Sequence, residues 1–136
     1  MQAHPYRPLE FTEYTEEELI RQIRTLLTEM GMSTHLKGFS YLCRAIEIVY
    51  MDKIAIRNVI VGLYRQIAEE NRTTVSCVER NCRTAIKLLF KNGDKLKLSE
   101  HFLKSSAEDT PSVREFTALL ADKLRRNLIN TGRTNL

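Results

Sequence analysis

The sequence is poor in the residues that build several kinds of functional site. It has three cysteines, three histidines, five glycines and no tryptophan among 136 residues. The glycines form no phosphate-binding loop, the cysteines form no C-x-x-C pair, and the histidines lack a second ligand at i+3 or i+4. No residue set offers a nucleophile with its base. We therefore expect no metal, no other cofactor and no enzymatic activity.

Long apolar runs are also missing. The run "NVIVGLY" at 58–64 is far shorter than the roughly 18 residues of a membrane-spanning helix. The N-terminus "MQAHPYRPLEF" has no basic stretch followed by an apolar one, so it is not a secretory signal. An odd number of cysteines fits a reducing compartment. We therefore expect a cytoplasmic location and no contact with a membrane.

The charge of the protein is unevenly distributed. The net charge is +4, but residues 1–30 hold six acidic and three basic side chains. The rest of the chain holds eighteen basic and eleven acidic ones. A basic body favours a polyanionic partner such as nucleic acid. Since many proteins without such a partner are basic too, the charge favours a nucleic-acid partner but does not establish one.

Apolar residues at helical spacing predict an all-α fold of about six helices with short connections. The predicted helices cover 15–30, 33 or 34 to 51, about 55–70, 74–90, about 98–104 and 111–128. We also predict a flexible arm at 1–14, a single domain at 15–130 and a frayed tail at 131–136.

Several helix ends carry recognisable signals. Thr15 and Glu18 have the spacing of a capping box. Thr73 or Thr74 is expected to cap the fourth helix. For the last helix we predict Thr110 as the cap and Pro111 in the first helical position.

The segment 63–83 is typical of a helix-turn-helix. A short helix, the corner "NRT" and a second helix with basic outward residues follow one another. The small Ala68 suits a close crossing of the two helices, and Val78 is expected to fill the corner. Arg72 stands at the corner position that prefers glycine. We therefore predict a DNA-binding motif in this segment.

The second helix of this motif would lie in the major groove of double-stranded DNA. Arginine can donate two hydrogen bonds to guanine, and glutamate can accept one from the cytosine amino group. We expect Glu79, Arg80 and Arg83 to read bases. Residues expected to contact phosphates or to flank the site are Arg65, Arg72, Thr74, Ser76, Cys77, Thr84 and Lys87. The spacing leaves open an ordinary solvated face, in which Glu79 and Arg83 form an ion pair.

Three separated segments resemble one known family. They are "HLKGFSYLCRAIEIVY" (35–50), "LYRQIAEENRTTVSCVERNCRTAIKLL" (63–89) and "EFTALLADKLR" (115–125). They are similar to the DNA-binding effector domain of the sporulation master response regulator of endospore-forming bacteria. The resemblance implies an all-helical domain that binds head-to-tail pairs of boxes built around TGTCGAA. It also implies a contact with the sigma factor of RNA polymerase and a possible homodimer on tandem sites.

The recognition-helix run of that family resembles S-R-V-E-R-x-x-R, and most of it is kept here. Cys77 stands where the family has an arginine, Asn71 replaces an apolar residue and Asn81 a small apolar one. The family's effector domain follows a receiver domain, whereas about 30 residues precede the match. We therefore expect an effector that aspartate phosphorylation does not control. The alternative is a protein-interaction module, or a competitor for the boxes, that acts through RNA polymerase or a related regulator.

Overall fold

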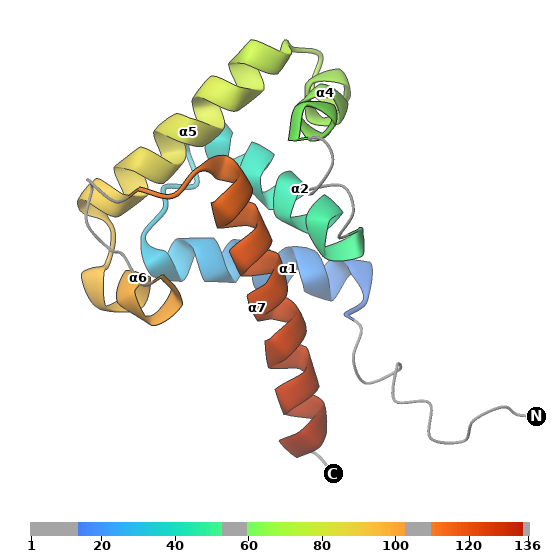
Figure 1. Ribbon diagram of the computed structural model, residues 1–136, viewed down its shortest axis with the longest axis vertical. Helices are drawn as coiled ribbons and strands as arrows, with labels where there is room; N and C mark the ends of the chain where they lie inside the picture. The colour runs from blue at the N-terminus through green and yellow to red at the C-terminus, as the bar shows by residue number, and fades with distance from the viewer. Residues whose placement is uncertain (1–13, 53–59, 103–109, 135–136) are drawn as a thin grey trace, which may run out of the picture.

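The computed structural model describes residues 14–52, 60–102 and 110–134. These residues form helices and no strand, which confirms the all-α prediction (Figure 1). The helices are α1 (Glu16–Met30), α2 (Lys37–Met51), α4 (Ile60–Glu70), α5 (Val75–Asn92), α6 (Lys95–His101) and α7 (Val113–Thr134). Residues 1–13 of the predicted arm, 55–59 of the predicted third helix, 103–104 of the fifth and 135–136 of the tail lie outside the described residues.

The centre of the fold is α2. It packs against α7, α5, α1 and α4, and its Phe39, Leu42 and Ile46 are at most 1% exposed. Burying side chains of this size contributes roughly 2 kcal/mol each. Because α2 touches both helices of the predicted DNA-binding motif, the core fixes where that motif lies.

A second part of the core is aromatic. The Phe90 and Phe102 rings meet edge to face at 5.2 Å, and the Phe102 and Phe116 rings stack at 5.5 Å. These residues come from α5, the end of α6 and α7, so the cluster joins three helices that are distant in sequence. It holds the C-terminal half of α5 against the rest of the molecule.

The first helix begins where its capping signal predicted. The Glu18 amide donates to the Thr15 hydroxyl at 3.2 Å, and the Thr15 amide donates to the Glu18 carboxylate at 3.2 Å. Gly31 ends the helix in the left-handed region with φ of 108°. Tyr14, which we placed in the arm, instead lies against the core with its ring 6.0 Å from that of Tyr50.

Two predicted helix starts were wrong. The second helix begins at Lys37 rather than at residue 33 or 34, because the Ser33 hydroxyl accepts from the His35 amide in a local turn. The fifth begins at Lys95 rather than at 98, because the Asp94 carboxylate accepts from the backbone amides of the first turn at 3.0 and 3.1 Å. In both cases a short-range hydrogen bond between a side chain and the backbone sets the first residue of the helix.

Both predicted ends of the last helix were also wrong. Ser112 rather than Thr110 caps α7: the Glu115 amide donates to the Ser112 hydroxyl at 3.1 Å, and the Ser112 amide donates to the Glu115 carboxylate at 2.9 Å. The helix continues to Thr134, past the predicted end near Leu128.

Candidate nucleic-acid interface

The helix-turn-helix predicted at 63–83 is present, formed by α4, a corner at 71–74 and α5. In Figure 1, α4 is seen nearly end-on while α5 runs across the picture, so the two helices cross steeply. The Thr73 amide donates to the Ala68 carbonyl at 2.9 Å, which folds the chain back at the end of α4. The Thr74 hydroxyl then accepts from the Cys77 amide at 3.1 Å and caps α5. This cap confirms the predicted start of the second helix.

The corner contains a residue in an unusual backbone conformation. Arg72 has φ of 54°, in the left-handed region that favours glycine. Its neighbour Asn71 donates to the Ile67 carbonyl twice, from its side-chain amide at 2.8 Å and from its backbone amide at 3.1 Å, which closes the end of α4. The strained residue stands at the position that the sequence predicted, and the surrounding hydrogen bonds hold Arg72 there.

Apolar packing under the corner sets the crossing of the two helices. Val78 and Ile67 are 0% exposed, and Ala68 is 4% exposed. Ala68 offers only a methyl group where the two helices approach, and Val78 fills the space beneath the turn. This packing confirms the inward residues predicted for the motif and makes α5 a rigid outer element.

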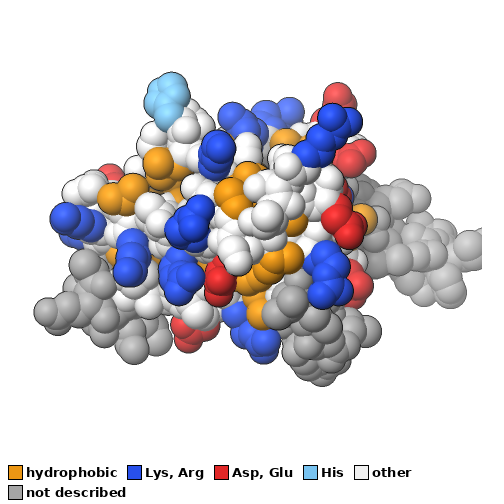
Figure 2. Space-filling view, turned by 90° about the horizontal axis from the view of Figure 1, so that it is seen from above, with side chains coloured by type: hydrophobic (Ala, Val, Ile, Leu, Met, Phe, Trp, Pro, Cys, Tyr) orange, Lys and Arg blue, Asp and Glu red, His pale blue; other side chains and the backbone are white. Residues whose placement is uncertain are grey.

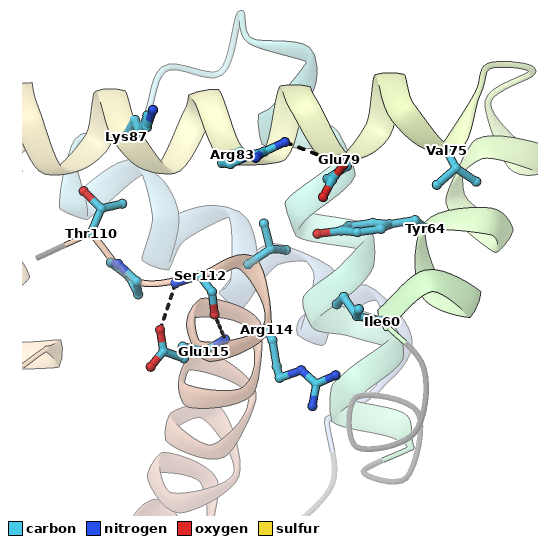
Figure 3. Close-up of a pocket in the computed structure, with 12 residues that line it drawn as sticks. Ile60, Tyr64, Val75, Glu79, Arg83, Lys87, Thr110, Ser112, Arg114 and Glu115 are labelled. Carbon is cyan, nitrogen blue, oxygen red and sulfur yellow. Dashed lines mark hydrogen bonds and ion pairs between the residues drawn. The ribbon is translucent and has the colours of Figure 1, made fainter.

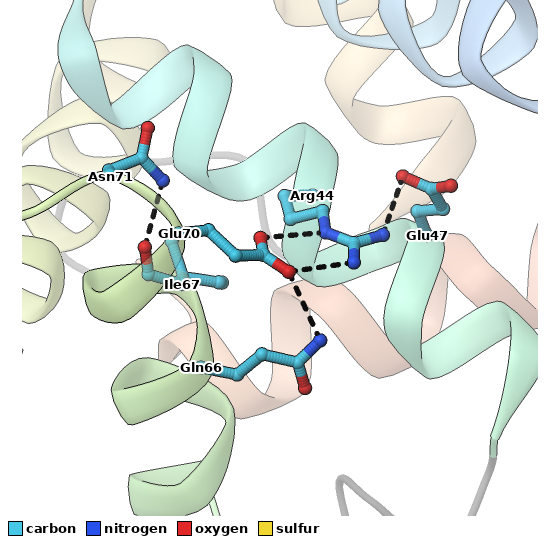
Figure 4. Close-up of polar contacts among 6 residues, drawn as sticks. All are labelled: Arg44, Glu47, Gln66, Ile67, Glu70 and Asn71. Carbon is cyan, nitrogen blue, oxygen red and sulfur yellow. Dashed lines mark hydrogen bonds and ion pairs between the residues drawn. The ribbon is translucent and has the colours of Figure 1, made fainter.

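A polar cluster fastens the end of α4 to α2 (Figure 4). The Arg44 guanidinium donates two hydrogen bonds to the Glu70 carboxylate, at 2.9 and 2.8 Å, and approaches Glu47 at 3.1 Å. Gln66 donates to the same Glu70 carboxylate at 3.2 Å. The hydrogen bond from Arg44 and that from Gln66 lower the pKa of Glu70 below its usual value. The last turn before the corner is therefore held from outside the motif.

One side of α5 faces solvent along much of its length. Its inner side chains Val78, Cys82, Ala85, Ile86 and Leu89 are at most 2% exposed, whereas Lys and Arg side chains spread over the outer face (Figure 2). Of the predicted site residues, the exposed ones are Arg65, Arg72, Thr74, Ser76, Arg80, Arg83, Thr84 and Lys87; Cys77 and Glu79 are half-buried. The structure thus brings the α5 residues to one outward side, with Arg65 and Arg72 on α4 and the corner.

Two of the three residues predicted to read bases are paired with each other. The Arg83 guanidinium lies 3.6 Å from the Glu79 carboxylate, with both side chains about half exposed. This is the ion pair that the solvated-face alternative required. Such an exposed pair contributes only about 0.3–0.5 kcal/mol, so it opens easily when a stronger partner arrives. Arg80 forms no hydrogen bond or ion pair with the residues that the structure describes.

Cys77 lies on the flank of α5 rather than at its centre. The Asn81 side-chain amide donates to the Cys77 Sγ at 3.3 Å. A hydrogen bond from Thr73 lowers the pKa of the Cys77 thiol, and the nearby charges of Lys37 and Arg80 lower it further. The position where the family has an arginine therefore holds a small thiol whose neighbours Lys37 and Arg80 are cations.

A cleft of about 690 Å³ borders α5 on the side of Glu79 and Arg83 (Figure 3). Helical spacing turns Cys77 away from these two residues, and Cys77 does not line the cleft. Tyr64 of α4, Glu79 and Arg83 of α5 and Arg114 of α7 are among its lining residues. Burial raises the pKa of Tyr64 to about 12, so this side chain stays neutral. Since Arg83 lines the cleft, it lies between the outer face of α5 and this cleft.

Two cations that border the motif were not among the predicted site residues. Arg44 and Lys37 both belong to α2, and neither lies in the segment that carries the helix-turn-helix pattern. The contact of the neighbouring Gly38 with Asn81, which brings the start of α2 beside α5, joins residues far apart in the chain and has no local signal in the sequence. In the described part of the chain no group of three or more His, Cys, Asp or Glu could hold a metal, and no helix could cross a membrane.

The family comparison agrees with this geometry. The sequence model described as sporulation initiation factor Spo0A, C terminal, matches residues 23–124, which is most of the chain. The chain therefore belongs to this family, as its resemblance predicted. The family is a DNA-binding effector domain of a sporulation regulator and not an enzyme family.

Proposed function

We propose that this member of the Spo0A C-terminal family is a sequence-specific transcription regulator that places α5 in the major groove. One observation carries the proposal: α5 is rigidly held by the corner and by α2, yet its outer side is exposed and basic. Direct reading of base edges requires exposed polar side chains held in place on a rigid helix.

Arg80 is the proposed centre of base readout. Its guanidinium is exposed on the middle of the outer face and is free to donate to guanine O6 and N7. Glu79 and Arg83 are proposed to read neighbouring bases after their mutual ion pair opens. Opening this pair costs about 0.5 kcal/mol, which is less than the 1–3 kcal/mol that a good base contact contributes.

Phosphate contacts should supply most of the affinity. Arg65, Arg72 and Lys87 are exposed cations around the outer face, and Thr84 and Ser76 are exposed hydroxyls on it. Thr74 uses its hydroxyl to cap α5, so it would reach DNA only through its backbone or methyl group. Because each phosphate contact releases counterions, binding should weaken steeply as salt rises.

Further partners follow from the family rather than from the geometry. The proposal includes binding to head-to-tail boxes as a pair of copies and a contact with the sigma factor of RNA polymerase. A DNA-binding regulator would act in the cytoplasm, where the chromosome lies. Action without control by aspartate phosphorylation stays a prediction, which treatment with a small phosphoryl donor would test.

A protein-interaction module is the second candidate. The observation that favours it is Cys77, which removes one cation from the groove side of α5, together with the internal pairing of Arg83 with Glu79. In that case the fold would be kept while the protein acts on RNA polymerase or on a related regulator.

The experiment that separates the two candidates is a titration of labelled DNA. One duplex carries two head-to-tail TGTCGAA boxes, and a second carries the same bases in scrambled order. Each is titrated by fluorescence anisotropy at two salt concentrations. Clear preference for the boxes that persists at the higher salt supports the regulator. Equal weak binding to both duplexes, lost as salt rises, would show that the outer side of α5 is an ordinary solvated face and does not read DNA sequence.

A further inference from the structure

The flank of α5 that carries Cys77 is bordered by the start of α2. A Cβ added at Gly38 would collide with the Asn81 carbonyl oxygen and lie 2.8 Å from the Ala85 Cβ. The absence of a side chain at Gly38 therefore lets the backbones of α2 and α5 touch. The first turn of α2 is fixed against the middle of α5 with little room to shift.

Lys37 directly precedes this contact and is the first residue of α2. Its side chain is exposed, and its charge is close enough to lower the pKa of the Cys77 thiol. The first turn of α2 contains no acidic residue, and Lys37 forms no hydrogen bond or ion pair within the described part of the chain. The Lys37 ammonium is thus available at the edge of the outer face of α5.

Arg65 lies on a different flank. It belongs to α4, whose neighbouring Tyr64 lines the cleft beside Glu79, on the side of α5 away from Cys77. Arg72 lies at the corner before α5, where Thr73 contacts Cys77. A helix in the major groove runs between two phosphate strands, because the groove is only about 12 Å wide. Cations on one flank alone would hold one strand and leave the other without a contact.

We propose that Lys37 binds a phosphate of the DNA strand opposite to the one held by Arg65 of α4, so that α2 forms the second side of a cradle around α5. This inference rests on the proposed function, since it assumes that α5 enters the groove. It assigns to α2 a part in DNA binding in addition to its part in the core. A backbone contact of this kind adds affinity without adding sequence preference.

The test compares Lys37→Gln with the wild-type protein on the box duplex and the scrambled duplex over a series of salt concentrations. Loss of one phosphate contact should weaken binding about threefold to tenfold on both duplexes at low salt and lower the salt slope by about one. Between 50 and 200 mM salt the variant should therefore lose about threefold less affinity than the wild type. Lys37→Arg should restore both values.

Lys97→Gln is the matched control, because Lys97 is an exposed lysine of α6, a helix that packs against α1. It should leave affinity and slope unchanged, and melting curves confirm that each variant is folded. If wild-type protein prefers the boxes but Lys37→Gln behaves like Lys97→Gln, the cradle is wrong and the proposed function stands. A loss on the box duplex alone would assign Lys37 to base reading and overturn the phosphate contact. If the wild type shows no preference, the proposed function fails and the cradle fails with it.

Discussion

Two arginines on basic helices, Arg125 of α7 and Arg80 of α5, are used in different ways. Arg125 donates to the Val49 and Tyr50 carbonyls at 2.6 and 2.8 Å, pairs with Asp122 at 2.9 Å and lies over the Tyr50 ring at 5.3 Å. Arg80 is exposed on the outer side of α5 and forms no such bond with any residue that the structure describes.

The difference teaches that net charge alone does not locate a nucleic-acid interface. Arg125 closes the C-terminal end of α2, so its donors are occupied by the fold. Arg44 likewise holds the end of α4 through Glu70. Arg80 has its donors free on a rigid helix. Substitutions of the first kind should change stability, and substitutions of the second kind should change binding.

The largest effect on stability is expected for Arg125→Ala. The variant leaves the last carbonyls of α2 without their donor. A hydrogen bond from a charged donor contributes about 1.5–3 kcal/mol to the stability of the fold. Since the side chain is partly exposed, we expect a loss of about 2 kcal/mol in urea unfolding. Arg80→Ala serves as the control and should change stability by less than about 0.5 kcal/mol. Equal losses in the two variants would remove the distinction between them.

Arg44→Ala should lower stability by about 1 kcal/mol at neutral pH, the upper end for an exposed pair, because its two bonds to Glu70 are well aligned. The pKa of Glu70 is lowered in the folded protein, so this contribution is present above the usual value of 4.5 and is lost as pH falls through the folded pKa. The difference between variant and wild type should therefore shrink in acid. A difference that does not change with pH would show that packing, not charge, dominates at Arg44.

Arg72→Gly should act in opposite directions on stability and binding. Glycine adopts the left-handed conformation without strain, so the variant should gain up to about 1 kcal/mol in stability. It also removes a cation from the corner, so its affinity for both duplexes should fall. Unfolding and titration of the same preparation check the pair of results. A variant that loses stability would contradict the strain assigned to Arg72.

The smallest change is chemical modification of Cys77, which leaves the fold intact. Its thiol has a lowered pKa, whereas burial raises the pKa of Cys43 and Cys82 to about 12. Since the thiolate is the reactive form, iodoacetamide should label Cys77 first, as measured by mass spectrometry. The box duplex should protect Cys77 from labelling, and the scrambled duplex should protect it less. Faster labelling of Cys43 would contradict the opposite pKa shifts of the two thiols, raised for Cys43 and lowered for Cys77.

Local signals in the sequence predicted much of the fold. Thr15 with Glu18, and Thr74, act within one helical turn, so their caps could be recognised without tertiary information. Ser112 and Glu115 also have the spacing of a capping box, but the preceding Thr110 and its proline offered a competing start. The wrong start of α7 therefore arose where two local signals stood close together.

The site was only partly predictable for a different reason. The exposure of Arg80 follows from helical spacing, and the sequence analysis found it. The position of Lys37 beside Cys77 depends on the contact between Gly38 and Asn81, which are far apart in the chain. Helical periodicity gives the side of a helix but not which other helix borders it.

The most direct test of base reading by α5 compares Arg80→Ala with Arg72→Gln on the box duplex and the scrambled duplex. Arg80→Ala should lose about 1–3 kcal/mol on the boxes and much less on the scrambled duplex, so the preference between them falls. Arg72→Gln should lose similar affinity on both, because a phosphate contact carries no sequence information. Equal losses on the two duplexes for Arg80→Ala would contradict its role in base readout and leave α5 as a solvated basic face.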